Sequence, residues 1–585
     1  MQRWAALLIG FSLLLFSCSS GDPAEPSRQD LPLPAGALTL QLQGKPGGTL
    51  RYPLPGEPST FNLLAAQDAR STLVSKLFTA TLLELDPMQQ TFQPGVAESW
   101  QISEDGLTVT LKLRPGLLFG DGIPLSAEDV LFTFRQIMRE DSQSHFKTDL
   151  LFPGQSLKFE SPDAQTIRIL LARPDASMEF FLSQLPVLPR HLLPAASGPI
   201  EQQWNLETPA QQMTGLGPFL IESHQPGLMT VLGRNPHYWK VDSNGERLPY
   251  LDRIEIHYIA DINNQVLRLQ TGELDLIDQV LTPENFQLLS RNQTDIRATD
   301  AGPSNKLSLL WFNLNQQSDS PDGQPLLSQE KRRWFADPDF RRAISLAINR
   351  QEITRIVFLE YATPASGMVT ALNRTWRAPQ IAPARHDPEA ARRLLRQAGF
   401  SWRAGSDAQL LGPRGKEVRF ELLTTTETSL NRMVALIQQD LKAIGIGISL
   451  RQEELRSVIS RVINARRYDV ALASFRFPWE PSDFSSTFHS SGQTHLWNPL
   501  QPKPATAWEE RIDDLMSQQR VTLDHEERRD LFHEVQQILA DNAPALPLIH
   551  WDLLIAHRSQ LHNLQPTDLV QCCLWNSWEL YFDSQ

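Results

Sequence analysis

The residues from Ala97 to Val130 read AESWQISEDGLTVTLKLRPGLLFGDGIPLSAEDV, and this stretch has the clearest pattern in the chain. Within it, Thr108–Leu113 has valine or leucine at every second position, which is typical of a strand with one buried face. The preceding SEDG at 103–106 is a tight-turn sequence, so Trp100–Leu113 predicts a β-hairpin. Ser126 and Asp129 then have the spacing of a capping box at the start of a helix.

Strands and helices are predicted to alternate on both sides of this stretch. In the first half, Thr49–Pro53 predicts a strand and Ser71–Thr81 a helix. The other expected elements are the strands Ile254–Tyr258, Ser308–Asn313, Asp469–Ser474 and Ala545–Ile555, the helices Asn264–Thr271, Asp339–Asn349, Asp387–Gly399, Trp508–Arg520 and Glu526–Asn542, and a β-α-β unit made of Phe420–Leu423, Leu430–Ala443 and Gly447–Leu450. This alternation indicates an α/β protein. A length of 585 residues indicates more than one lobe.

Composition excludes several classes of protein. The chain has 54 basic and 67 acidic side chains and a net charge of −13, whereas nucleic-acid-binding proteins need a basic footprint, so no nucleic-acid partner is expected. An apolar fraction of 41% is enough for large cores and argues against disorder. Three cysteines cannot form a disulfide framework. The adjacent Cys572 and Cys573 are interpreted as buried thiols or, alternatively, as a vicinal disulfide.

The N-terminus resembles an export signal. Residues 1–17 contain one basic residue, Arg3, and an apolar run too short to span a bilayer, which is typical of a secretory signal peptide. The segment Leu15-Phe16-Ser17-Cys18 resembles a bacterial lipobox, in which the cysteine is lipidated and becomes the first mature residue. We therefore expect a lipid anchor at Cys18, a linker over 18–37, and a position on the periplasmic or cell-surface side. The alternative is an ordinary signal peptide with an incidental cysteine.

Catalytic and cofactor motifs are not evident. The sequence has no HExxH, GxSxG or Walker-type phosphate loop, so no catalytic residues, metal site or cofactor are predicted. Glu480 and Asp483 could form an acid–base pair of a glycosidase, but acidic residues in loops more often contact solvent or ligand.

Several stretches together resemble one family. The Ala97–Val130 segment is very similar to bacterial extracellular solute-binding proteins of family 5, the peptide-, nickel- and oligosaccharide-binding components of ABC importers. Further similarities follow in the family's order over nearly the whole mature chain, at Gly215–Phe219, Asn235–Trp239, Asp339–Arg350, Asp387–Phe400 and Gly445–Leu450.

The resemblance implies a fold and a function. The expected fold is a two-lobed periplasmic-binding-protein-like clamp of type II. Lobe one would comprise 38–301 and 543–585, with an inserted subdomain at about 67–193, and lobe two would comprise 302–542. The chain would capture a small solute, with a peptide as the expected ligand, and deliver it to permease subunits. Alternatives are an oligosaccharide- or metal-chelate-binding protein of the same family, a lipid-anchored glycosidase or peptidase, and a sensor that presents its closed form to a signalling partner.

The resemblance also indicates ligand-binding residues. Peptide-binding relatives present an aspartate from a lobe-two loop of the form Trp-x-x-Asp-x-x-Asp/Glu-Pro to the ligand's amine, but here Phe477 stands at that aspartate position. The loop suggests that Arg476 binds an anionic group and that aromatic rings stack on the ligand, unless those rings pack between the lobes or in the core. The predicted ligand contacts are Thr60, Phe61, Asn62, Phe475, Arg476, Phe477, Trp479, Glu480 and Asp483.

Overall fold

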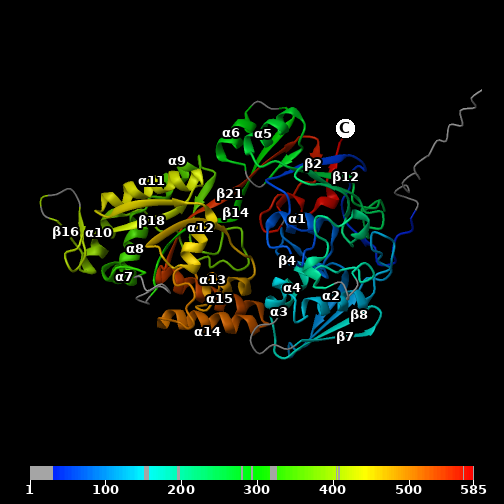
Figure 1. Ribbon diagram of the computed structural model, residues 1–585, viewed down its shortest axis with the longest axis horizontal. Coiled ribbons are helices and arrows are strands. Elements are labelled where there is room, and N and C mark those ends of the chain that lie inside the picture. The colour runs from blue at the N-terminus through cyan, green and yellow to red at the C-terminus, as the bar shows by residue number, and fades with distance from the viewer. Residues whose placement is uncertain are drawn as a thin grey trace, which may run out of the picture.

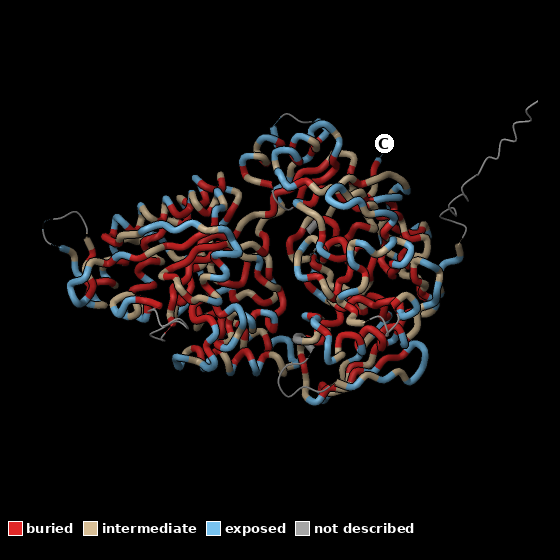
Figure 2. Tube along the Cα trace, viewed as in Figure 1, coloured by how far each residue is buried: buried red, intermediate tan, exposed pale blue. Residues whose placement is uncertain are grey.

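The computed structural model describes residues 31–583 apart from 151–156, 194–197, 279–280, 292–293, 316–325, 404, 406–408 and 571, and apart from the side chains of 148–150 and 572. The signal segment and Cys18 therefore lie outside the described residues. The described chain forms two lobes joined by long strands (Figure 1). Buried segments are gathered inside each lobe (Figure 2).

Lobe one is built on a four-stranded sheet in the order β2-β12-β10-β9. The predicted strand at Thr49 is β2, which lies parallel to β12, while β10 is antiparallel to both β12 and β9. A separate two-stranded parallel sheet is formed by β1 and β11. The bounds are β1 (Leu38–Thr39), β2 (Thr49–Leu54), β9 (Phe219–Gln225), β10 (Met229–Arg234), β11 (Lys240–Val241) and β12 (Arg253–Tyr258).

The Ala97–Val130 segment lies in a subdomain between β2 and β9. The predicted hairpin is confirmed as β5 and β6, part of the sheet β5-β6-β8-β7, and the capping box of Ser126 and Asp129 begins α2. A separate hairpin, β3-β4, points toward lobe two (Figure 1). The bounds are α1 (Ala69–Phe78), β3 (Leu83–Asp86), β4 (Thr91–Pro94), β5 (Ala97–Ile102), β6 (Thr108–Leu113), α2 (Ala127–Ile137), α3 (His145–Leu150), β7 (Leu157–Asp163), β8 (Thr166–Leu171) and α4 (Met178–Gln184).

Lobe two contains a larger sheet in the order β13-β21-β14-β20-β18-β19, with β15 paired to β21. The predicted β-α-β unit is confirmed, because α11 connects the parallel strands β18 and β19. The bounds are β14 (Ile296–Phe312), α7 (Gln329–Ala336), α8 (Pro338–Ala347), α9 (Arg350–Val357), β15 (Ala362–Pro364), α10 (Pro388–Gln397), β16 (Ser401–Trp402), β17 (Leu410–Leu411), β18 (Arg419–Thr425), α11 (Thr428–Ala443), β19 (Gly447–Glu453), α12 (Leu455–Ile459), β20 (Val470–Arg476), α13 (Ser485–Phe488), α14 (Ala507–Val521), α15 (His525–Asn542) and β21 (Ala545–Arg558).

The strands β14 and β21 run antiparallel from one lobe to the other. Their lobe-two ends pair with β20 and β15, and the far end of β21 pairs with β13 (Leu276–Ile277) beside α5 (Ile262–Thr271) and α6 (Pro283–Ser290). Asp552 lies in this crossing, and one carboxylate oxygen, Oδ1, is buried without a hydrogen-bond partner among the described residues. Burial, together with the nearby charge of Asp300, raises the pKa of Asp552 to about 7.

The C-terminal segment beyond β21 packs against lobe one. Leu561, Leu574 and Phe582 belong to the same apolar cluster as the strands of lobe one, and a short pair, β22 (Leu561–His562) with β23 (Tyr581–Phe582), ends the chain. Cys573 is buried in this cluster. None of the helices in the described part of the chain combines the length and apolar character that a membrane crossing requires.

Candidate functional site

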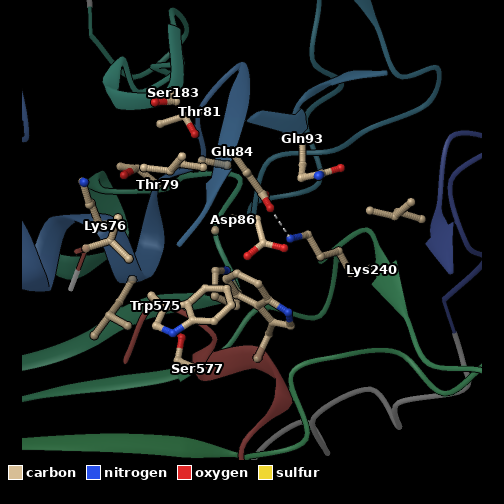
Figure 3. A pocket seen from close by; sticks show the side chains of 18 of the residues that line it. Lys76, Thr79, Thr81, Glu84, Asp86, Gln93, Ser183, Lys240, Trp575 and Ser577 are labelled. Carbon is tan, nitrogen blue, oxygen red and sulfur yellow. Dashed lines mark hydrogen bonds and ion pairs between the residues drawn. The ribbon is translucent and has the colours of Figure 1, made fainter. Parts of the chain in front are cut away.

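A cavity of about 560 Å³ lies in lobe one, and Figure 3 shows side chains that line it. Its walls come from the ends of α1 and α4, the β3-β4 hairpin, β11 and residues of the C-terminal segment between 570 and 578. Leu85 of β3 lines the cavity and also packs against an apolar cluster of lobe two. Through Leu85, the wall of the cavity is in contact with lobe two.

One side of the cavity has a buried ion pair. The ammonium of Lys240 on β11 lies 2.7 Å from a carboxylate oxygen of Glu84 on β3, as the dashed line in Figure 3 shows. The Lys240 side chain is only 2% exposed, and its ammonium lies 3.8 Å from the ring centroid of Trp578. Both the carboxylate and the aromatic face stabilise the cation in this buried position.

Lys76 lies on the opposite side of the cavity in Figure 3. It occupies the last turn of α1, and its ammonium donates to Oε1 of Gln184 at 2.9 Å. Burial lowers the pKa of Lys76 to about 8, because the charged form loses hydration there.

Aromatic side chains form the floor of the cavity. Trp575 and Trp578 come from the C-terminal segment, and their rings meet edge to face with centroids 6.3 Å apart. Trp575 Nε1 donates to the carbonyl of Gln565 at 2.7 Å, which fixes the orientation of the indole. Such rings provide rigid apolar area against which a ligand can pack.

Gln90, at the tip of the β3-β4 hairpin, connects lobe one to lobe two. Its Nε2 donates to the carbonyl of Leu372 at 2.7 Å, and its Oε1 accepts from the backbone N–H groups of Arg374 at 3.0 Å and Thr375 at 3.1 Å. Trp479 Nε1 also points at Oε1, from 3.4 Å. Because other residues of the hairpin line the cavity, the hairpin connects the cavity wall to lobe two.

A second set of contacts joins the lobes near α4. Arg520 on α14 lies 3.2 Å from the carboxylate of Asp175, and its carbonyl accepts from Ala176 N at 2.7 Å. Arg528 on α15 donates to the carbonyl of Ala176 at 3.0 Å. The lobes are therefore also in contact at this second place.

The predicted lobe-one contacts are buried inside their lobe. Thr60 is 8% exposed and Phe61 and Asn62 are fully buried. The amide of Asn62 donates to the carbonyl of Ile200 at 2.6 Å, and Phe61 packs edge to face against His224. These side chains hold the loop after β2 against the rest of lobe one, and their contact with a ligand stays a prediction.

The predicted lobe-two residues are spread over different environments. Arg476 is half exposed and forms an ion pair with buried Asp568 of the C-terminal segment. Phe475 packs against Trp311, with ring centroids 5.7 Å apart, and Phe477 stacks on Phe484 at 6.1 Å. Both rings therefore contribute to packing within lobe two.

The other members of this loop differ in exposure. Trp479 meets Phe92 and Phe180 of lobe one at centroid distances of 5.8 and 6.2 Å, so its ring lies between the lobes. Glu480 is 1% exposed and forms an ion pair with Arg528 inside lobe two, while Asp483 is exposed. The buried pairing leaves the Glu480 carboxylate unavailable as the acid or base of a glycosidase in this structure.

Sequence reasoning did not find the residues that line the cavity. Lys76, Glu84 and Lys240 lie far apart in the chain, and no local motif connects them. The only available signal was the density of aromatic residues near Trp575 and Trp578. Among the described residues no group of three or more His, Cys, Asp or Glu side chains could hold a metal ion.

Comparison with known proteins identifies the family. The family model described as bacterial extracellular solute-binding proteins, family 5 middle, matches residues 91–495, which is more than half of the chain. The chain belongs to this family. Its members are extracellular binding proteins, so this family 5 protein acts outside the cytoplasmic membrane.

Curated relatives agree with this membership. A probable ABC transporter-binding protein of Deinococcus radiodurans is 25% identical over 422 residues, covering 69% of this chain and 68% of that protein. The glutathione-binding protein GsiB of Escherichia coli K12 is 26% identical over 514 residues, covering 86% and 90%.

Solved structures share the fold of this family 5 protein. The ABC transporter substrate-binding protein CtaP of Listeria monocytogenes superposes with a TM-score of 0.75 at 23% identity, covering 92% of this chain and all of that one. The oligopeptide-binding protein AppA of Bacillus subtilis, solved with a nonapeptide, gives a TM-score of 0.70 at 22% identity, covering 93% and 100%. The expected two-lobed clamp is confirmed.

Proposed function

We propose that this family 5 protein is the substrate-binding component of an ABC importer and captures a peptide between its lobes. The observation that carries the proposal is the cavity in lobe one whose β3-β4 wall contacts lobe two. Its volume, about 560 Å³, lies within the range of roughly 300–1,000 Å³ that small-ligand pockets occupy. The names of two relatives, a glutathione-binding and an oligopeptide-binding protein, favour peptides over other solutes.

Capture follows from the two-lobed geometry. The β3-β4 hairpin lines the cavity and also bonds to lobe two through Gln90, so a ligand held against the hairpin favours the arrangement in which these bonds form. Ligand binding therefore shifts the population toward the closed form, which a permease can distinguish from the open one. This mechanism requires no covalent chemistry, and we propose that the protein delivers its ligand unaltered.

We also propose that Cys18 carries a lipid that holds the protein at the membrane near its permease, which raises the effective concentration there. The test is metabolic labelling with a fatty acid, followed by mass spectrometry of the mature N-terminus. We expect the wild-type protein to incorporate the fatty acid and the Cys18→Ala variant not to incorporate it. Equal labelling would contradict the anchor.

A ligand panel tests the capture itself. Protein lacking residues 1–17 is melted with random short peptides, oligosaccharides and nickel chelates, because a ligand that binds only the folded form raises the melting temperature. Stabilisation by peptides, with the peptides recovered intact, is the expected result. Stabilisation by sugars or chelates alone would contradict the peptide assignment, and turnover would favour an enzyme.

A further inference from the structure

The cavity is lined by three basic side chains, and they differ in their partners. Lys240 pairs with Glu84 at 2.7 Å. Arg114 donates to the carbonyl of Gly95 at 2.8 Å and lies 5.0 Å from the ring centroid of Trp239. Lys76 differs, because within the described part of the chain its side chain meets only the neutral amide of Gln184.

The hydrogen-bond donors around Lys76 are already engaged. Thr79 donates its hydroxyl to the carbonyl of Ser75 at 2.9 Å, Thr81 to that of Leu83 at 2.6 Å, and Ser183 to that of Phe180 at 2.7 Å. These hydroxyls line the same side of the cavity as Lys76 (Figure 3). A lysine ammonium has three N–H donors, and the bond to Gln184 uses one of them. Lys76 therefore retains charged N–H donors that a ligand on this side can use.

We propose that Lys76 binds a carboxylate of the captured ligand. The inference rests on the proposed capture of a peptide and specifies one feature of that peptide. Lys76 is partly buried and has no counter-charge among the described residues, so a ligand carboxylate would supply that partner in a charge-assisted hydrogen bond. Arg476, which the sequence favoured as the anion-binding residue, already has such a partner in Asp568.

The experiment compares matched peptide mixtures on matched variants. Random tripeptides are supplied as free acids, as C-terminal amides, and as amides that contain one glutamate. The variants are Lys76→Met, which removes the charge, and Lys76→Arg, which keeps it. The control is Lys442→Met, because Lys442 also occupies the last turn of a helix, α11, but is exposed in lobe two. Melting of each variant without peptide verifies that it folds.

Wild type and Lys442→Met should bind the free acids about tenfold to a hundredfold more tightly than the plain amides, which is the range for a hydrogen bond to a charged group. Lys76→Met should lose that preference and Lys76→Arg should retain part of it. If the glutamate-containing amides bind as well as the free acids, the carboxylate comes from a side chain rather than the C-terminus.

Two other outcomes would overturn the inference in distinguishable ways. Equal stabilisation of the wild type by free acids and both amide mixtures would refute the carboxylate anchor and leave peptide capture intact. No stabilisation by any mixture would refute peptide capture, and the inference with it. A preference for free acids that survives in Lys76→Met would place the anion-binding group elsewhere.

Discussion

Replacing Glu480 by glutamine should destabilise lobe two strongly. Glu480 and Arg528 are both buried, with side chains 2% and 6% exposed, so the substitution leaves a buried guanidinium without its counter-charge. Removing one partner of a buried ion pair costs about 3–5 kcal/mol. Arg528 keeps bonds to Gln519 and to Ser482 Oγ at 3.0 and 3.1 Å, which favours the lower end, about 3 kcal/mol.

Calorimetry measures this loss. At roughly 2–4 °C per kcal/mol for a domain of 150–250 residues, the melting temperature should fall by about 6–12 °C. Asp483→Asn is the matched control, because Asp483 is three residues away and exposed, and exposed substitutions usually change stability by less than about 0.5 kcal/mol. The double variant Glu480→Gln/Arg528→Met should recover part of the loss, since it removes both charges.

The opposite result would revise the role of Glu480. If Glu480→Gln changes stability by less than about 1 kcal/mol and instead weakens peptide binding, the carboxylate contacts the ligand as the sequence suggested, and the buried ion pair is not its main function.

Three further perturbations test the interlobe contact, the crossing strands and the lobe-two arginine. Gln90→Ala removes hydrogen bonds between the lobes, so small-angle scattering should give a larger radius of gyration, whereas Met88→Ala, at an exposed position of the same hairpin, should not; equal radii would contradict the interlobe role. The folded-state pKa of Asp552, about 7, exceeds its unfolded value near 3.9, so between these values only the folded state holds the proton. Stability should therefore fall as the pH rises from about 4 to 7, and Asp552→Asn should flatten this part of a urea-midpoint profile; an unchanged profile would disprove the assignment. Arg476→Ala should weaken binding of free-acid peptides less than loss of the cavity lysine does, because Asp568 already compensates Arg476; a larger loss in calorimetric titration would return the anion site to lobe two.

Local patterns predicted many of the elements, left others such as β7, β8 and α6 unnamed, and predicted only part of one crossing strand. The helix that ends at Gly272 and the β-α-β unit around α11 were predicted because capping, glycine in the left-handed region and apolar periodicity act within a few residues. Only Ser308–Asn313 was expected as a strand, whereas β14 spans Ile296–Phe312. Its first half contains Gly302 and Pro303, and its register against β21 shifts there, so the residues show no regular alternation.

Local sequence patterns predicted much less of the candidate site than of the secondary structure. The loop Phe475–Asp483 was predicted to contact the ligand, but a linear motif does not show which of its side chains face inward. In the structure Trp479 lies between the lobes and Glu480 pairs with Arg528 inside lobe two. A residue far away in sequence decided the environment in each case.

The sequence by itself determined the α/β elements, their order and the family, because helix caps, turns and strand alternation act over a few residues and the family's motifs are contiguous. The tertiary structure alone decided the cavity and its charges. Lys76, Lys240 and Trp578 come together only when the subdomain, the lobe-one sheet and the C-terminal segment pack against one another. In this packing Lys240 lies beside the carboxylate of Glu84, whereas Lys76 lies beside the neutral amide of Gln184. Long-range packing sets this difference.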